Sequence, residues 1–139
     1  MKKGLILCLT IMVAVIMTGC GKTTKNTLSE ITLDDYLEII ENKETKVVYI
    51  DSNDDMSANY KKSLKKTLSD LDKKVYYLDT TKFASKDAKV LKFMNASSKT
   101  KDGYTVPMIV YIKNGKIADS TIGYIDDLTI KTFIKKYVK

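Results

Sequence analysis

A short run of acidic and amide residues, DSNDD, begins at Asp51 and carries oxygen atoms of the kind that bind cations. Asp51, Asn53 and Asp55 have the one, three and five spacing of a calcium-binding loop. Such a loop also needs a glycine at its sixth position and a glutamate at its twelfth. Met56 and Lys62 occupy those positions here. We therefore expect no metal site and keep calcium binding only as an alternative.

The same acids suit the start of a helix. Asp54 and Asp55 directly precede a stretch in which apolar residues recur at helical spacing. A carboxylate at this place accepts hydrogen bonds from free backbone N–H groups and complements the positive end of the helix dipole. Helix capping is therefore the first role that we expect for Asp54 and Asp55.

Cysteine usage excludes thiol chemistry from most of the chain. The sequence has two cysteines, Cys8 and Cys20, and no histidine. Disulfide exchange needs an attacking thiolate, and no cysteine follows Cys20. From Gly21 onward the chain can form neither an internal disulfide nor a Cys-His catalytic pair, so we expect no enzyme activity and no cofactor.

The charge of the chain points away from nucleic acids. Its net charge is +7, yet all 24 basic residues are lysines. Arginine is the preferred residue for bidentate contacts with phosphates and base edges. The lysine excess instead suits either an ordinary solvated surface or contact with an anionic membrane or wall polymer.

The surrounding pattern places DSNDD between a buried strand and a helix. It predicts the order α-β-α-β-α-β-β-α, which gives an α/β fold with a mixed four-stranded sheet and helices on both faces. Asn114-Gly115 predicts a tight turn between the last two strands. The expected elements are helices at 32–42, 56–71, 85–95 and 124–138, strands at 46–50 and 74–80, and a hairpin at 106–123.

The helix expected at 56–71 has a clear apolar stripe. The stripe consists of Met56, Tyr60, Leu64, Leu68 and Leu71. Lysines, among them Lys61, fall away from it, so we expect the stripe to be buried and Lys61 to face solvent.

Tyrosines are frequent in and near the expected strands, as at Tyr49, Tyr76, Tyr77, Tyr111 and Tyr124. Such a set could form a platform for carbohydrate. Strand alternation instead favours packing of these rings in the core, which we expect.

The first 19 residues have the pattern of a secretory signal peptide. A basic start, MKK, precedes 14 mostly apolar residues from Gly4 to Met17, fewer than the roughly 20 that a membrane-spanning helix needs. The run ends in MTGC, which resembles a bacterial lipobox, in which a peptidase cuts before the cysteine. The resemblance implies that Cys20 carries lipid and anchors the chain at the outer face of the bacterial cytoplasmic membrane. An ordinary signal peptide with an incidental cysteine is the alternative.

Three segments follow from this pattern. We expect a signal peptide at residues 1–19, the lipidated Cys20 with a flexible tether at 20–31, and one folded domain at 32–139. The tether, which includes GKTTKNTLSE, is polar and has no periodic apolar face.

The order of the elements and several short segments resemble the thioredoxin fold. VVYI, followed by a turn and a long helix, is similar to the strand that leads to the redox helix. TVPMIVYIKNGK is similar to the segment in which a cis-proline opens the last hairpin, and Gly123-Tyr124 to the corner before the last helix. Over roughly residues 32 to 139 the sequence resembles in particular the short thioredoxin-like proteins of Gram-positive bacteria known as bacteriocin transport accessory proteins.

The resemblance implies where a redox motif would lie. A Cys-x-x-Cys motif would fall on DMSA, so that Asp55 and Ala58 stand in place of the two cysteines. It also implies a peptide-binding face, on which the residue before the cis-proline pairs with an extended segment. The residues of that face would be Asp54, Asp55, Val106, Pro107, Gly123 and Tyr124.

We therefore expect a redox-inactive binding or accessory protein, held to membrane lipid through Cys20. Its partner would be a protein or peptide rather than nucleic acid. One alternative is a member of the thiol-disulfide oxidoreductase family with residual chaperone-like activity. Another is a surface protein that binds calcium through Asp51, Asn53 and Asp55.

Overall fold

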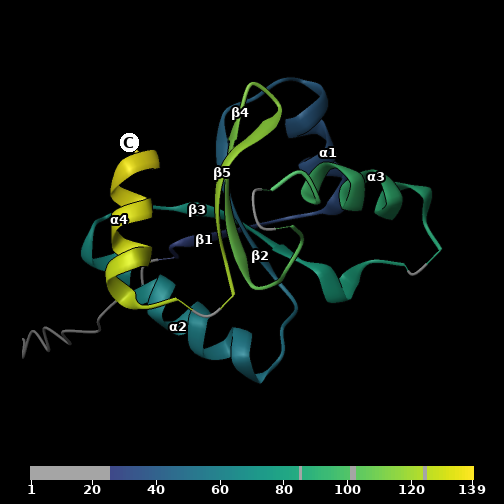
Figure 1. Ribbon diagram of the computed structural model, residues 1–139. Coiled ribbons are helices and arrows are strands. Elements are labelled where there is room, and N and C mark those ends of the chain that lie inside the picture. Colours follow the sequence, from purple (N-terminus) through teal and green to yellow (C-terminus); the bar gives the residue numbers. More distant parts are fainter. Residues whose placement is uncertain (1–25, 85, 101–102, 124) are drawn as a thin grey trace, which may run out of the picture.

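The structure, a computed structural model, describes residues 26–84, 86–100, 103–123 and 125–139. A central sheet separates two layers of helices (Figure 1). Along the chain the elements are β1 (Leu28–Ile31), α1 (Leu33–Glu41), β2 (Lys46–Asp51), α2 (Asp55–Asp70), β3 (Val75–Asp79), the short 3-10 helix η1 (Thr80–Lys82), α3 (Ala88–Ser97), β4 (Met108–Lys113), β5 (Lys116–Ile122) and α4 (Asp127–Tyr137).

The sheet is mixed, as expected, but it has five strands rather than four. Its order is β1-β3-β2-β4-β5, in which β1, β2 and β3 are parallel while β4 and β5 form the antiparallel hairpin. The extra strand is β1, which lies within the segment that we expected to be a tether. Backbone pairing with β3, as between Leu28 and Val75, forms this strand. Its sequence, LSEI, is too short and too polar to show a strand pattern.

Alternate residues of β2 enter two separate cores. Val47 and Tyr49 pack with α2 and α4 on one face of the sheet. Val48 and Ile50 pack with α1 and α3 on the other. Burial on both faces explains why β2 reads as a continuous apolar run, and it confirms the expectation of helices on both sides.

Local sequence signals correctly predicted the start of α1 and the turn between β4 and β5. Thr32 and Asp35 form a capping box at the start of α1. Asn114 and Gly115 both have positive φ in the turn between β4 and β5, which is the backbone of a type I′ turn.

The buried stripe of α2 differs from the expected one in its first turn. Met56 is 59% exposed, whereas Ser57, Tyr60, Leu64 and Leu68 are buried. The spacing from Ser57 to Tyr60 and Leu64 continues one helical face, and Met56 lies beside that face rather than on it. A small polar residue therefore takes the buried position, which an apolar periodicity search does not detect.

The turn at Gly115 generates the first prediction. Gly115 has φ +72°, and a Cβ there would collide with the backbone carbonyl oxygen of Ile40 and lie 3.0 Å from the Cα of Lys43. We expect Gly115→Ala to destabilise the fold by clearly more than the roughly 1–2 kcal/mol that a left-handed conformation alone costs. Chemical denaturation measures the loss. Gly103→Ala is the control, because Gly103 has φ +82° but no atom within 4 Å of the added Cβ; equal losses would contradict the close approach of the turn to α1.

Candidate functional site

The DSNDD segment forms the connection between the end of β2 and the start of α2 (Figure 1). Asp54 is the N-cap of α2, as predicted. Its carboxylate accepts hydrogen bonds from the backbone N–H of Ser57 at 2.7 Å and from the hydroxyl of Ser52 at 2.6 Å. The bonds from Ser52 and Ser57 lower the pKa of Asp54. The side chain is thus fully engaged in starting the helix.

Asp51, the last residue of β2, is completely buried. The Nζ of Lys61 lies 2.6 Å from its carboxylate, and the hydroxyl of Tyr77 donates to the same oxygen at 3.2 Å. The backbone N–H of Asn53 donates to the other oxygen at 3.0 Å. Burial opposes ionisation of Asp51, but the hydrogen bonds from Lys61 and Asn53 outweigh it, so that the pKa of Asp51 is lowered.

Lys61 is therefore not on the solvent face that its place in the sequence suggested. Its side chain is 19% exposed. Its Nζ donates a hydrogen bond to the hydroxyl oxygen of Tyr77 at 2.7 Å and lies 4.4 Å from the centre of that ring. Burial opposes the charge, but the hydrogen bonds with Asp51 and Tyr77 raise the pKa of Lys61. Sequence reasoning missed this pair, because Lys61 lies off the apolar stripe of α2 and because Tyr77 reaches Asp51 only through the position of β3 beside β2.

This arrangement does not favour the calcium alternative. The ammonium group of Lys61 already neutralises Asp51 and also approaches the side-chain oxygen of Asn53 at 3.4 Å. Asp55, the third residue of the proposed ligand set, is exposed on the first turn of α2. Within the described part of the chain, no cluster of three acidic, histidine or cysteine residues could hold a metal ion.

Three tyrosine rings, of Tyr49, Tyr60 and Tyr77, stack next to the junction between β2 and α2. The rings of Tyr49 and Tyr60 are stacked with centroids 5.5 Å apart, and Tyr77 stacks on Tyr49 at 5.8 Å. Burial raises the pKa of Tyr60 to about 12, so its hydroxyl stays protonated near neutral pH. That hydroxyl and the hydroxyl of Thr121 share a hydrogen bond of 3.3 Å, which joins α2 to β5. The expectation that tyrosines pack in the core is confirmed for Tyr49.

The residues expected beside the proline lie at the same end of the sheet. The Val106–Pro107 peptide bond is cis, and the backbone N–H of Gly123 donates to the carbonyl of Pro107 at 2.9 Å. Val106 is half-buried, and neither of its backbone polar groups has a hydrogen-bond partner among the described residues. Two other expected site residues, Cys20 and Tyr124, lie outside the described residues.

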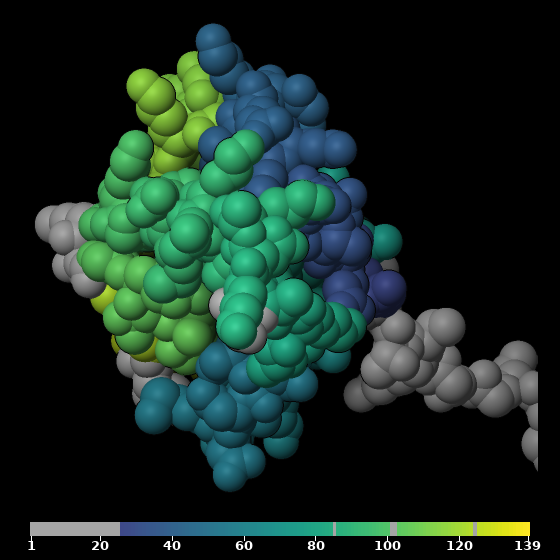
Figure 2. Space-filling model, turned by 90° about the vertical axis from the view of Figure 1, so that its right-hand side faces the viewer, coloured from purple at the N-terminus to yellow at the C-terminus, as the bar shows by residue number. Residues whose placement is uncertain are grey.

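We call the residues at this end of the sheet the helix-start face. It consists of Asp55, Met56 and Ala58, which are exposed on α2, and of the half-buried Val106 and Gly123, which lie shortly before β4 and directly after β5. The hydrogen bond between Tyr60 and Thr121 connects the α2 part of this face to the β5 part. Among the described residues, no hydrogen bond links Asp54 or Asp55 to Val106. The chain around the start of α2 protrudes at the lower end of the molecule (Figure 2).

Comparisons with known proteins place the fold. No protein-family model matches the chain, and no curated protein matches it significantly. Among solved structures, a candidate oxidoreductase with a thioredoxin fold is 18% identical with a TM-score of 0.56, covering 81% of this chain and 95% of that one. A thioredoxin from Plasmodium falciparum is 14% identical with a TM-score of 0.54, over 79% of this chain and 98% of that one. A thioredoxin mutant from Halobacterium salinarum is 14% identical with a TM-score of 0.55, over 82% and 93%. The chain therefore has a thioredoxin-like fold.

The buried pair generates the second prediction. We expect Lys61→Met to cost about 3–5 kcal/mol of folding stability, because it leaves the carboxylate of Asp51 buried without its counter-charge. Asp51→Asn combined with Lys61→Met should cost less than the sum of the two single changes. Urea denaturation of the four proteins in this double-mutant cycle measures the coupling.

The matched control is Lys65→Met, one turn further along α2, where the side chain is exposed. It should change stability by no more than about 0.5 kcal/mol. If Lys61→Met were as mild as this control, the ion pair would contribute nothing and the description of the junction would be wrong.

Proposed function

We propose that this chain is a membrane-anchored extracytoplasmic lipoprotein whose thioredoxin-like domain binds a protein or peptide partner and carries out no thiol-disulfide exchange. The observation that carries the proposal is the identity of the residues at the start of α2. Asp55 and Ala58 are the first and fourth residues of the helix, the places at which the family resemblance implies the two cysteines of a redox motif.

The chemistry of that helix end supports a role other than catalysis. A helix N-terminus lowers the pKa of a cysteine and so supplies the thiolate that attacks a disulfide. Here the helix end is kept, but the carboxylate of Asp55 cannot exchange with sulfur and the methyl group of Ala58 offers no reactive atom. Because no cysteine follows Cys20, no other residue of the domain supplies a thiol.

Two features of the helix-start face support binding. Val106 offers backbone groups without partners among the described residues, which suits an extended segment that adds its own backbone hydrogen bonds. On the first turn of α2, Met56 exposes 59% of its surface, and an exposed thioether adapts to partners of different shape. The negative charge of Asp55 favours a partner segment with a lysine or arginine near its apolar residue.

We propose that lipid on Cys20 holds the chain at the outer face of the bacterial cytoplasmic membrane. None of the helices in the described residues is long and apolar enough to cross a membrane. Two acyl chains on Cys20 would make attachment stable where one would not. The proposed accessory role in transport or immunity rests on the resemblance to bacteriocin transport accessory proteins alone.

The two alternatives receive less support. Calcium binding would require Lys61 to leave Asp51. Residual chaperone-like activity in an oxidoreductase-family protein would use the same exposed face, but no feature of the described residues favours it over binding of a defined partner.

Photo-crosslinking in cells tests the proposal. A photoreactive phenylalanine analogue placed at Asp55 or at Val106 should yield one discrete crosslinked product. The same analogue at Lys65, which is exposed on α2, should yield none. Mass spectrometry then identifies what is bound.

The same crosslinked bands from all three positions would contradict binding at this face. So would the absence of a crosslinked band from both Asp55 and Val106. A disulfide-reduction assay on a Cys20→Ser form decides the redox part separately, since any exchange activity there would overturn the claim that the domain is not catalytic.

A further inference from the structure

Five lysines of the domain lie at the end of the sheet opposite the helix-start face. The parallel strands β2 and β3 begin there, with Lys46 as the first residue of β2 and Lys74 directly before β3. The turn between β4 and β5 lies at the same end, because β4 is antiparallel to β2. We call this region the lysine end and define it as Lys43, Lys46, Lys74, Lys113 and Lys116.

Hydrogen bonds hold the parts of the lysine end together. The turn between Lys113 and Lys116 is fastened to the start of β2, because the backbone N–H of Gly115 donates to the carbonyl of Glu44 at 3.0 Å and that of Asn114 to the hydroxyl of Thr45 at 3.3 Å. These contacts place the hairpin lysines beside residues 43–46.

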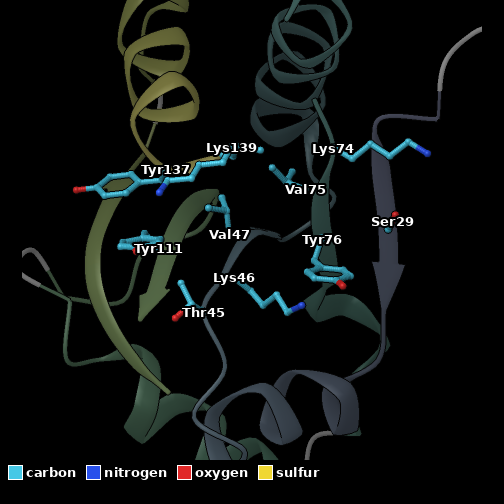
Figure 3. A pocket seen from close by; sticks show the side chains of 11 residues that line it. Ser29, Thr45, Lys46, Val47, Lys74, Val75, Tyr76, Tyr111, Tyr137 and Lys139 are labelled. Atoms are coloured by element: carbon cyan, nitrogen blue, oxygen red, sulfur yellow. The ribbon is translucent and has the colours of Figure 1, made fainter. Parts of the chain in front are cut away.

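An open pocket of about 380 Å³ lies between the strand starts (Figure 3). Lys46 of β2 and Lys74, directly before β3, are among its lining residues, together with the rings of Tyr76, Tyr111 and Tyr137. A pocket that combines ammonium groups with aromatic rings suits the boundary between water and lipid, where tyrosines are enriched.

Most of this positive charge is not neutralised within the domain. Glu44 pairs with Lys46 at 3.3 Å. Lys43, Lys74, Lys113 and Lys116 have no ion-pair partner within the described residues, and all four are exposed. The charges of Asp72 and Lys73, which precede Lys74, are opposite and add no net charge to this end.

The chain enters the domain at this same end. The first residue of β1, Leu28, pairs with Val75, and the carbonyl of Thr27 accepts a hydrogen bond from the N–H of Val75 at 3.1 Å. β1 therefore begins beside Lys74. Five residues separate Cys20 from Asn26, and the six steps of an extended chain between them span about 20 Å.

We propose that the lysine end binds an anionic phospholipid surface and turns the helix-start face away from the membrane. The inference rests on the proposed anchoring of Cys20, which would keep Asn26, at the start of the described chain, within about 20 Å of the headgroups and so bring this end of the sheet toward the membrane. Each lysine close to an anionic membrane contributes about 1 kcal/mol. The acidic start of α2, with Asp54 and Asp55, would be repelled by the same anionic surface if that end faced it. Attraction of the lysine end and repulsion of the helix start therefore favour the same orientation of the domain.

Vesicle binding of the full chain tests this inference. Sedimentation compares vesicles of phosphatidylcholine with vesicles that also contain phosphatidylglycerol, and the ratio of the two affinities removes any contribution from the apolar N-terminal segment. The triple variant Lys43→Gln, Lys113→Gln, Lys116→Gln should reduce the preference for phosphatidylglycerol by on the order of 100-fold, since three lysines contribute about 3 kcal/mol.

The matched control neutralises three exposed lysines elsewhere, as Lys62→Gln, Lys65→Gln, Lys131→Gln. It should keep most of the preference, and a thermal melt should show that both variants fold. An equal loss in the two variants would mean that only net charge matters, and an unchanged preference would mean that the lysine end does not bind; either result overturns the inference. Because the assay does not require acylation of Cys20 or a peptide partner, such a failure leaves the proposed function untouched.

Discussion

The ion pair between Asp51 and Lys61 determines how α2 begins. A carboxylate at the end of a central strand is buried here, and such a group is tolerated only when an opposite charge and hydrogen bonds compensate for the loss of water. Lys61 supplies the charge from α2, while Tyr77 supplies a hydroxyl from β3. The carbonyl of the same aspartate accepts a hydrogen bond from Thr80 at 2.8 Å. One residue thus ties β2 to the helix that follows it and to the strand beside it, and the position of the helix-start face depends on that junction.

Three aspartates that look equivalent in the sequence have three different surroundings. Asp51 is buried in an ion pair, Asp54 caps the helix, and Asp55 is exposed on the first turn. The carboxylates of Asp51 and Asp54 are already bonded within the domain, so Asp55 is the one of the three that a partner could contact. At the other end of β2 lie four lysines without ion-pair partners among the described residues, one of which, Lys74, is beside the place where the chain enters the domain. The proposed membrane contact and the proposed partner contact therefore use opposite ends of one short strand.

Features that depend on neighbouring residues could be predicted from the sequence. The capping box of Thr32, the cap of Asp54 and the turn at Asn114-Gly115 each follow from residues within four positions of one another. The ion pair of Lys61 with Asp51 could not be predicted, because helical spacing places Lys61 away from the apolar stripe and because its second partner, Tyr77, comes from a strand that lies next to β2 only in the folded sheet. β1 was missed for a related reason, since its pairing with β3 forms a strand from residues without strand periodicity. Cys20 and Tyr124 remain predictions.

Hydrogen exchange at the start of α2 tests most directly whether the Asp51–Lys61 pair positions this helix. Amide exchange would be measured by NMR for the wild type and for Lys61→Met, comparing the amides of residues 57–61 with those of α1 and α4. If the pair positions α2, exchange at 57–61 accelerates by at least tenfold more than exchange in the distant helices, because the first turn loses its fixed connection to β2. Equal acceleration everywhere would show only a general loss of stability, and unchanged exchange at 57–61 would show that the helix start is held without the pair.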